Sequence, residues 1–199
     1  MTDNRETWLE NAVTALSTLF TDHGYDVPVA RVSVGWPSRG GLSLKKRVLG
    51  ECWKPGVSAD GISQVYISPM MIDPVQVLAT LLHELVHVWD KGEHGHRGPF
   101  VAACKDFGLK GPWTATTAGE DLAMMLVDIL VTLGEYPHSQ LTPSLQKKVS
   151  KTYMRKVECE ETGYVLRTTK KWLDLYGPPV CPCCGDTMKS EEEEETEDE

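Results

Sequence analysis

The sequence predicts an α+β protein in which a helix and a small antiparallel sheet precede a long central helix, with a small β module near the C-terminus. Three observations predict this fold. Apolar residues recur at helical spacing in residues 4–20 and again in residues 74–89. Short β-like stretches lie between these two helices. After about residue 144 the chain becomes basic, and short strand-like runs replace long helical patterns.

The first predicted helix covers residues 4–20, with Asp3 or Asn4 as its N-cap. The three β-like stretches that follow are separated by Gly- and Pro-rich turns, which is typical of a small antiparallel sheet. They read RVSVGW (31–36), KRVLGECW (46–53) and SQVYISP (63–69).

The central helix is expected to begin at Pro74, because proline suits the first turn of a helix, and to end at Gly92. A second helix is expected to begin around Pro99 and to carry Phe100. A third is expected to run from about Gly119 to about Leu133.

These patterns divide the chain into residues 1–142, a main domain, residues 143–189, a small basic module, and residues 190–199, an acidic tail. The last ten residues, SEEEEETEDE, account for most of the formal net charge of −9 and are expected to be disordered. Between residues 144 and 172, eight basic residues outnumber three acidic ones. A basic stretch with interspersed aromatic residues is a candidate surface for DNA.

The beginning of the chain, MTDNRETWLENA, lacks a cationic stretch leading into an apolar one. The longest apolar run, residues 123–130, is interrupted by Asp128 and is too short to span a bilayer. We therefore expect a protein without a membrane partner. The expected location is the cytoplasm, near the nucleoid, or the host cytoplasm if the protein is viral.

A candidate zinc site lies in the central helix at HELVH, residues 83–87. Residues four apart lie on one face of a helix, so His83 and His87 can bind the same ion. Glu84 points beside the metal, where it can act as the general base on zinc-bound water. HELVH thus predicts a zinc-dependent peptidase.

A catalytic zinc needs a third protein ligand and one open position. The spacing excludes a metzincin, because Asp90 and Glu93 stand where that pattern needs glycine and histidine. The remaining candidates are His94, His96 and Glu120. His96 is favoured, because it lies just before a helix in which Phe100 can anchor it. Asp90 is expected to orient a histidine.

HELVH followed by HRGPF resembles the SprT-like (Spartan-type) zinc metallopeptidases, in which a histidine with an aromatic residue four positions later follows HExxH across a short loop. The stretch GECW (50–53) and the N-terminal helix also resemble that family's layout over about residues 5–110. The resemblance implies a zincin-like fold, zinc-dependent endopeptidase activity and, as for several members, action on proteins bound or crosslinked to DNA. Arg97 stands where many members have glycine.

The same resemblance implies a C-terminal zinc ribbon, in which two Cys-x-x-Cys knuckles hold a structural zinc. Cys181 and Cys184 form one knuckle. In the other, Cys159 is present but Thr162 stands at the position of the second cysteine. Three alternatives remain open: Cys183 as the fourth ligand, three cysteines with water or a glutamate, or a fold without stable metal.

The sequence therefore predicts a zinc endopeptidase, a hydrolase that acts on protein substrates and binds DNA through its basic module. The alternative is a non-catalytic nucleic-acid- or protein-binding module in which zinc is structural. The candidates for stabilising the oxyanion are His94, Arg97 and Tyr66.

Overall fold

The computed structural model describes residues 4–43, 46–143 and 154–190. The chain divides into two compact units, residues 1–145 and 146–199, close to the boundary expected after residue 142. No helix in the described ranges is long and apolar enough to cross a membrane.

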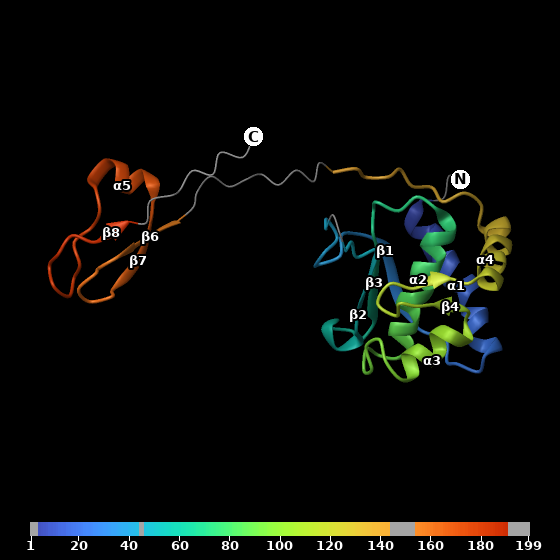
Figure 1. The fold of residues 1–199 in the computed structure, drawn as a ribbon. Coiled ribbons are helices and arrows are strands. Elements are labelled where there is room, and N and C mark those ends of the chain that lie inside the picture. Colours follow the sequence, from blue (N-terminus) through green and yellow to red (C-terminus); the bar gives the residue numbers. More distant parts are fainter. Residues whose placement is uncertain (1–3, 44–45, 144–153, 191–199) are drawn as a thin grey trace. The chain divides into compact units, whose positions relative to one another are not determined.

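The first unit is an α+β structure in which a three-stranded sheet lies on one side and helices α1, α2 and α4 on the other (Figure 1). Each of its long helices lies close to an expected helix. The elements are α1 (Arg5–Asp22), β1 (Ala30–Val34), β2 (Gly50–Trp53), η1 (Pro55–Val57), β3 (Ser63–Ile67), α2 (Pro74–Trp89), α3 (Pro99–Asp106), β4 (Leu109–Lys110), β5 (Thr117–Ala118) and α4 (Glu120–Leu133).

The sheet is mixed, and the prediction of an antiparallel sheet is wrong for one of its two pairings. Strand β3 lies between the other two, antiparallel to β2 but parallel to β1. Parallel neighbours need a long connection, and residues 35–62, which contain β2, provide it. Alternating hydrophobicity marks a strand but carries no information about its direction, so the sequence pattern could not distinguish the two arrangements.

The side chains of β3 alternate between buried and half-buried, and this pattern identifies the two faces of the sheet. Ser63, Val65 and Ile67 are buried on one face, whereas Gln64 and Tyr66 are half-buried on the other. The buried face packs against α1 and α2, and their apolar side chains make one core. Its largest fully buried members are Phe20, Phe100, Leu9, Leu16, Ile67, Leu78, Leu81, Leu82, Leu85 and Leu126.

Helix α2 is fixed at both ends by local interactions. The Asp73 side chain accepts hydrogen bonds from the backbone N–H groups of Val75 and Gln76, and Pro74 occupies the first turn. At the other end Lys91 and Gly92 have φ values of +53° and +66°, so the helix stops and the chain turns back. The helix is thus buried along most of its length and held at a fixed position in the core.

The second unit is a three-stranded antiparallel sheet in the order β7-β6-β8, with a short helix. Its small core contains Val157, Cys159, Cys181 and Met188. The helix was not expected, because seven residues are too few to show a helical period. The elements are β6 (Met154–Glu158), β7 (Val165–Thr169), α5 (Lys170–Tyr176) and β8 (Lys189–Ser190).

Ser190 was assigned to the acidic tail but lies in β8, opposite Val157. Strand pairing with β6 therefore extends one residue further than the composition suggested. Residues 191–199, which make up the rest of the predicted tail, lie outside the described residues.

Candidate metal centre and active site

Helix α2 supplies the first two histidines of the site. His83 and His87 lie one turn apart, with ring centroids separated by 5.0 Å. His83 is buried, with 8% of its surface exposed, and His87 is half-buried. The helical spacing read from the sequence therefore places two imidazoles side by side at the edge of the core.

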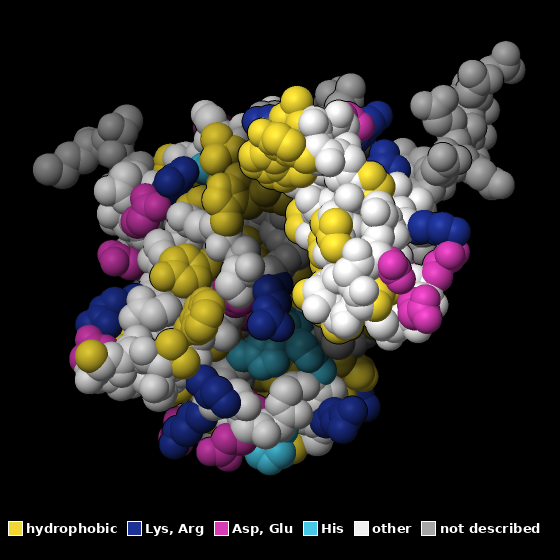
Figure 2. All heavy atoms as spheres, turned by 90° about the vertical axis from the view of Figure 1, so that its left-hand side faces the viewer, with side chains coloured by type: hydrophobic (Ala, Val, Ile, Leu, Met, Phe, Trp, Pro, Cys, Tyr) yellow, Lys and Arg dark blue, Asp and Glu magenta, His cyan; other side chains and the backbone are white. Residues whose placement is uncertain are grey.

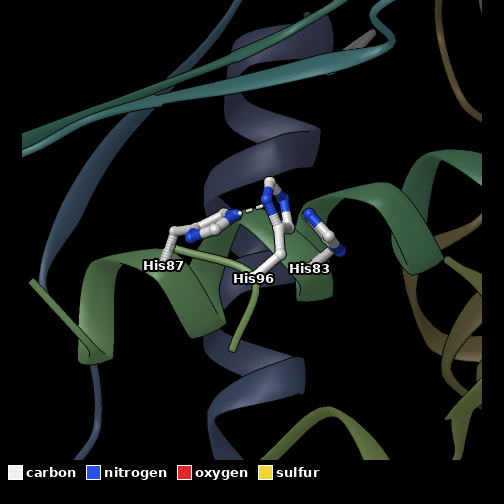
Figure 3. Close-up of side chains that lie close together, drawn as sticks. All are labelled: His83, His87 and His96. Atoms are coloured by element: carbon white, nitrogen blue, oxygen red, sulfur yellow. Dashed lines mark hydrogen bonds between the residues drawn. The ribbon is translucent and has the colours of Figure 1, made fainter. Parts of the chain in front are cut away.

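His96 completes the group, as the sequence analysis favoured. Its Nε2 lies 3.2 Å from Nε2 of His87. One nitrogen from each of the three histidines lies within 4.8 Å of the other two, and the three rings converge on a common point (Figure 3). Two nitrogens bound to one tetrahedral zinc lie about 3.3 Å apart, so the group needs only a small adjustment to hold this ion.

The return loop that brings His96 back depends on glycine. Gly92, Gly95 and Gly98 all have positive φ, a backbone conformation that other residues seldom adopt. Together they reverse the chain between α2 and α3. The spacing between His87 and His96 is therefore set by loop geometry rather than by a helical period.

The Phe100 ring contacts all three imidazole rings. It is fully buried on α3, and its ring stacks on His87 with centroids 4.1 Å apart and an interplanar angle of 23°. It also meets His83 and His96 edge to face, at 5.1 and 5.2 Å. Phe100, the expected anchor for His96, thus packs against all three histidines of the group.

The histidines are suited to bind a cation because they stay neutral. Burial lowers the pKa of His83 to about 3 and that of His87 to about 4, and it also lowers the pKa of His96. The neighbouring histidines lower the pKa of His83 and His87 further, because each would repel a second positive charge. At neutral pH each ring therefore offers a free lone pair.

Thr116 orients His83, and the sequence analysis did not identify it. The Thr116 hydroxyl lies 2.9 Å from Nδ1 of His83, which leaves Nε2 for the metal. Such a partner on the far nitrogen fixes the ring and its tautomer. Thr116 lies 33 residues away in sequence, just before β5, so no local pattern connects the two residues.

Glu84 lies next to the histidines and is buried, with 6% of its surface exposed. Burial, with a smaller contribution from the charge of Glu51, raises its pKa to about 8. Strand β2 approaches Glu84 so closely that a Cβ added at Gly50 would lie 2.5 Å from Glu84 Oε1. The absence of a side chain at Gly50 thus makes room for the carboxyl group.

The two other candidate ligands lie elsewhere. His94 is bound by Asp90, whose carboxylate accepts hydrogen bonds from the His94 backbone N–H at 2.9 Å and from its Nδ1 at 2.6 Å. Asp90 therefore orients a histidine, as expected, but one outside the metal group. Glu120 is exposed at the start of α4 and does not join the three histidines.

A pocket of about 670 Å³ opens beside the histidines. His83 and Glu84 line it, together with Lys46, Arg47 and residues 114–117. Histidine side chains reach the molecular surface, in cyan, in Figure 2. Tyr66 is not near this pocket, because it lies on the opposite face of the sheet; it is therefore wrong as an oxyanion-stabilising residue.

The cysteines of the second unit form a separate group. Sulfur atoms of Cys159, Cys181 and Cys184 lie within 4.8 Å of one another, and Cys159 and Cys184 are 3.4 Å apart. Thr162 lies 3.4 Å from the Cys181 sulfur, and hydrogen bonds from Thr162 and, to a smaller extent, from the backbone N–H groups of Cys183 and Cys184 lower the pKa of that thiol to about 6. Cys183 is exposed and outside the group. Three thiols are compatible with zinc.

Two further cysteines lie in the first unit: Cys52 is half-buried and Cys104 is buried. Burial raises the pKa of both to about 12.

The fold and these residues define an α+β protein with one group of three histidines, two from helix α2 and one from the loop after it, and a second group of three cysteines. No family model, curated protein or solved structure matches the chain.

Proposed function

We propose that the chain is a zinc-dependent endopeptidase of the SprT type. The observation that carries the proposal is the convergence of His83, His87 and His96 beside the buried carboxyl group of Glu84. A structural zinc site does not require a nearby carboxyl group that does not itself bind the metal. Three neutral histidines with a free position are the ligand set of a catalytic zinc.

In the proposed reaction a water molecule attacks the carbonyl carbon of a peptide bond, and the C–N bond breaks. Zinc, when bound, polarises the carbonyl and lowers the pKa of the attacking water. In its ionised form, Glu84 accepts the proton that the water loses and delivers it to the leaving amine, so that a carboxylate and an amine are formed. His83, His87 and His96 would hold the ion. Thr116 is hydrogen-bonded to one of these rings, that of His83, and Phe100 contacts all three.

Proteins bound or crosslinked to DNA are the proposed substrates. Support comes from the resemblance of HELVH and HRGPF to SprT-like peptidases and from the basic composition of residues 144–172. In this proposal the second unit binds DNA while the first cleaves the protein on it. The competing function is a non-catalytic binding module with structural zinc.

Glu84→Gln distinguishes the two functions. We expect this variant to keep its zinc, measured by elemental analysis, and to lose at least about 100-fold in cleavage of a DNA-bound protein. Glu120→Gln is the matched control, because Glu120 is exposed and outside the histidine group.

Two results would oppose the peptidase. One is a wild-type protein that holds zinc but cleaves neither a DNA-bound protein nor itself, with or without DNA. The other is equal cleavage by wild type and Glu84→Gln. The first result would favour the binding module.

A further inference from the structure

A second hollow, of about 300 Å³, lies on the face of the sheet that is turned away from α2. Three aromatic residues, Trp36, Trp53 and Tyr66, line it together with Val57 and the polar residues Ser38, Glu51, Ser58 and Gln64. Its volume is at the lower end of those that hold small ligands. The two tryptophans have 40% and 36% of their surfaces exposed, although aromatic side chains of this size are mostly buried in folded proteins.

The sheet register brings these side chains together. Glu51 lies opposite Tyr66 in the β2–β3 pair, and Trp53 lies two residues further along β2 on the same face. Trp36 follows β1, and the Tyr66 ring covers Gly35 so closely that a Cβ there would lie 2.8 Å from it. Three chain segments thus build one aromatic-lined hollow.

Glu51 provides the charge. Its carboxylate accepts hydrogen bonds from the backbone N–H and hydroxyl of Ser38 and from Nε1 of Trp53, at 2.8 and 3.0 Å for the two N–H donors. These three bonds leave one of about four acceptor positions open. Among the described residues that line the hollow, Glu51 is the only charged one.

We propose that this hollow binds the cationic side chain of a lysine or arginine in a polypeptide. Aromatic faces attract cations through their negative π surface, and the fixed carboxylate supplies a full opposite charge. Apolar walls suit the methylene stem of either side chain. An anionic ligand would be repelled by Glu51, and an apolar ligand would leave its negative charge without an opposite charge.

Strand β2 connects this hollow to the proposed active site. Glu51 and Trp53 line the hollow, whereas Gly50 on the same strand borders the pocket that contains Glu84. If the proposed peptidase function holds, the hollow is a secondary binding site for basic polypeptides on the opposite face of the sheet from the cleavage site. The binding itself does not depend on that function.

The test is a titration of the full chain carrying Glu84→Gln, so that no peptide can be cleaved. The probes are N-acetylated tetralysine amide, tetraarginine amide and tetraglutamine amide, and the readout is the NMR signal of the Trp53 indole N–H. We expect the two cationic peptides to shift this signal and tetraglutamine not to do so. Glu51→Gln should weaken binding about 5-fold and Trp36→Leu about 3-fold.

Asp60→Asn is the matched control, because Asp60 is an exposed carboxylate that pairs with Arg31 outside the hollow. It should leave the affinity unchanged. Equal weakening by Asp60→Asn and Glu51→Gln would show non-specific attraction and overturn the proposal. So would equal binding of tetraglutamine, or an affinity unaffected by both Glu51→Gln and Trp36→Leu. None of these outcomes depends on proteolysis, so they leave the peptidase proposal untouched.

Discussion

At the scale of single residues, the histidine group depends on side chains that bind no metal. Thr116 holds the far nitrogen of His83, and Phe100 lies against all three imidazole rings. Both contacts reduce the number of orientations that the rings can adopt. Because a ligand that is already oriented loses less entropy on binding, these residues should raise the affinity for zinc.

Thr116→Val tests the role of the hydroxyl. Valine keeps the shape of threonine but cannot bind Nδ1 of His83, so zinc affinity should fall about 10- to 100-fold. Competition with a chromophoric chelator measures this affinity. Thr117→Val is the control, since Thr117 lines the same pocket; an equal loss in both variants would contradict the assignment.

Phe100→Ala tests the packing of the Phe100 ring against the three imidazole rings. Loss of this buried ring should reduce the free energy of unfolding by about 3–5 kcal/mol, as measured by denaturant titration. Zinc affinity should fall as well, because the rings lose their support. Phe107→Ala is the control: Phe107 is equally buried but contacts Phe20, His23 and Tyr25 instead. It should lose stability while the affinity of the folded protein for zinc stays the same.

At the scale of elements, the site requires close approach between β2 and α2. Gly50 allows this approach, because a Cβ at that position would lie 2.5 Å from Glu84 Oε1 and 2.8 Å from Thr80 Cγ2. At distances below about 3.0 Å either the strand or the side chains of Glu84 and Thr80 must shift. The distance between strand and helix therefore sets the position of the proposed general base.

Gly50→Ala should separate β2 from α2 and displace Glu84. We expect a loss of about 1–3 kcal/mol in the free energy of unfolding and reduced proteolysis, with zinc content maintained. Thermal unfolding, peptidase assays and elemental analysis measure the three quantities. Gly56→Ala is the control, because a Cβ there meets nothing within 4 Å. Wild-type activity in Gly50→Ala would show that the close approach is not required.

At the scale of the whole molecule, each unit carries one candidate metal group. The histidines belong to the unit of residues 1–145 and the cysteines to that of residues 146–199. Because each group is built within its own unit, loss of one metal should leave the other in place.

Zinc stoichiometry tests this independence. We expect two zinc ions for each wild-type chain and one for each chain with His96→Ala, measured by elemental analysis. Cys181→Ser should also leave one ion, whereas Cys183→Ser should keep both, since Cys183 is exposed and outside the cysteine group. A single ion in the wild type that is retained in Cys181→Ser would show that the three cysteines bind no zinc. If His94→Ala empties the histidine site while His96→Ala does not, the choice of His96 is wrong.

The sequence by itself determined the features that depend on neighbours along the chain. The five-residue HELVH places His83 and His87 on one helical face, and Gly92 and Pro99 bracket a loop that allows His96 to return. Apolar periodicity placed the long helices within a few residues of their observed ends. These features follow from local backbone geometry, which a sequence pattern records directly.

Only the tertiary structure decided what depends on distant segments. The parallel pairing of β1 with β3, the hydrogen bond between His83 Nδ1 and the Thr116 hydroxyl, and the approach of Gly50 to Glu84 each join residues that are far apart in sequence. The choice among His94, His96 and Glu120 was also made by the path of the chain. Contacts of this kind arise from packing around a common core, and no periodicity in a single sequence encodes them.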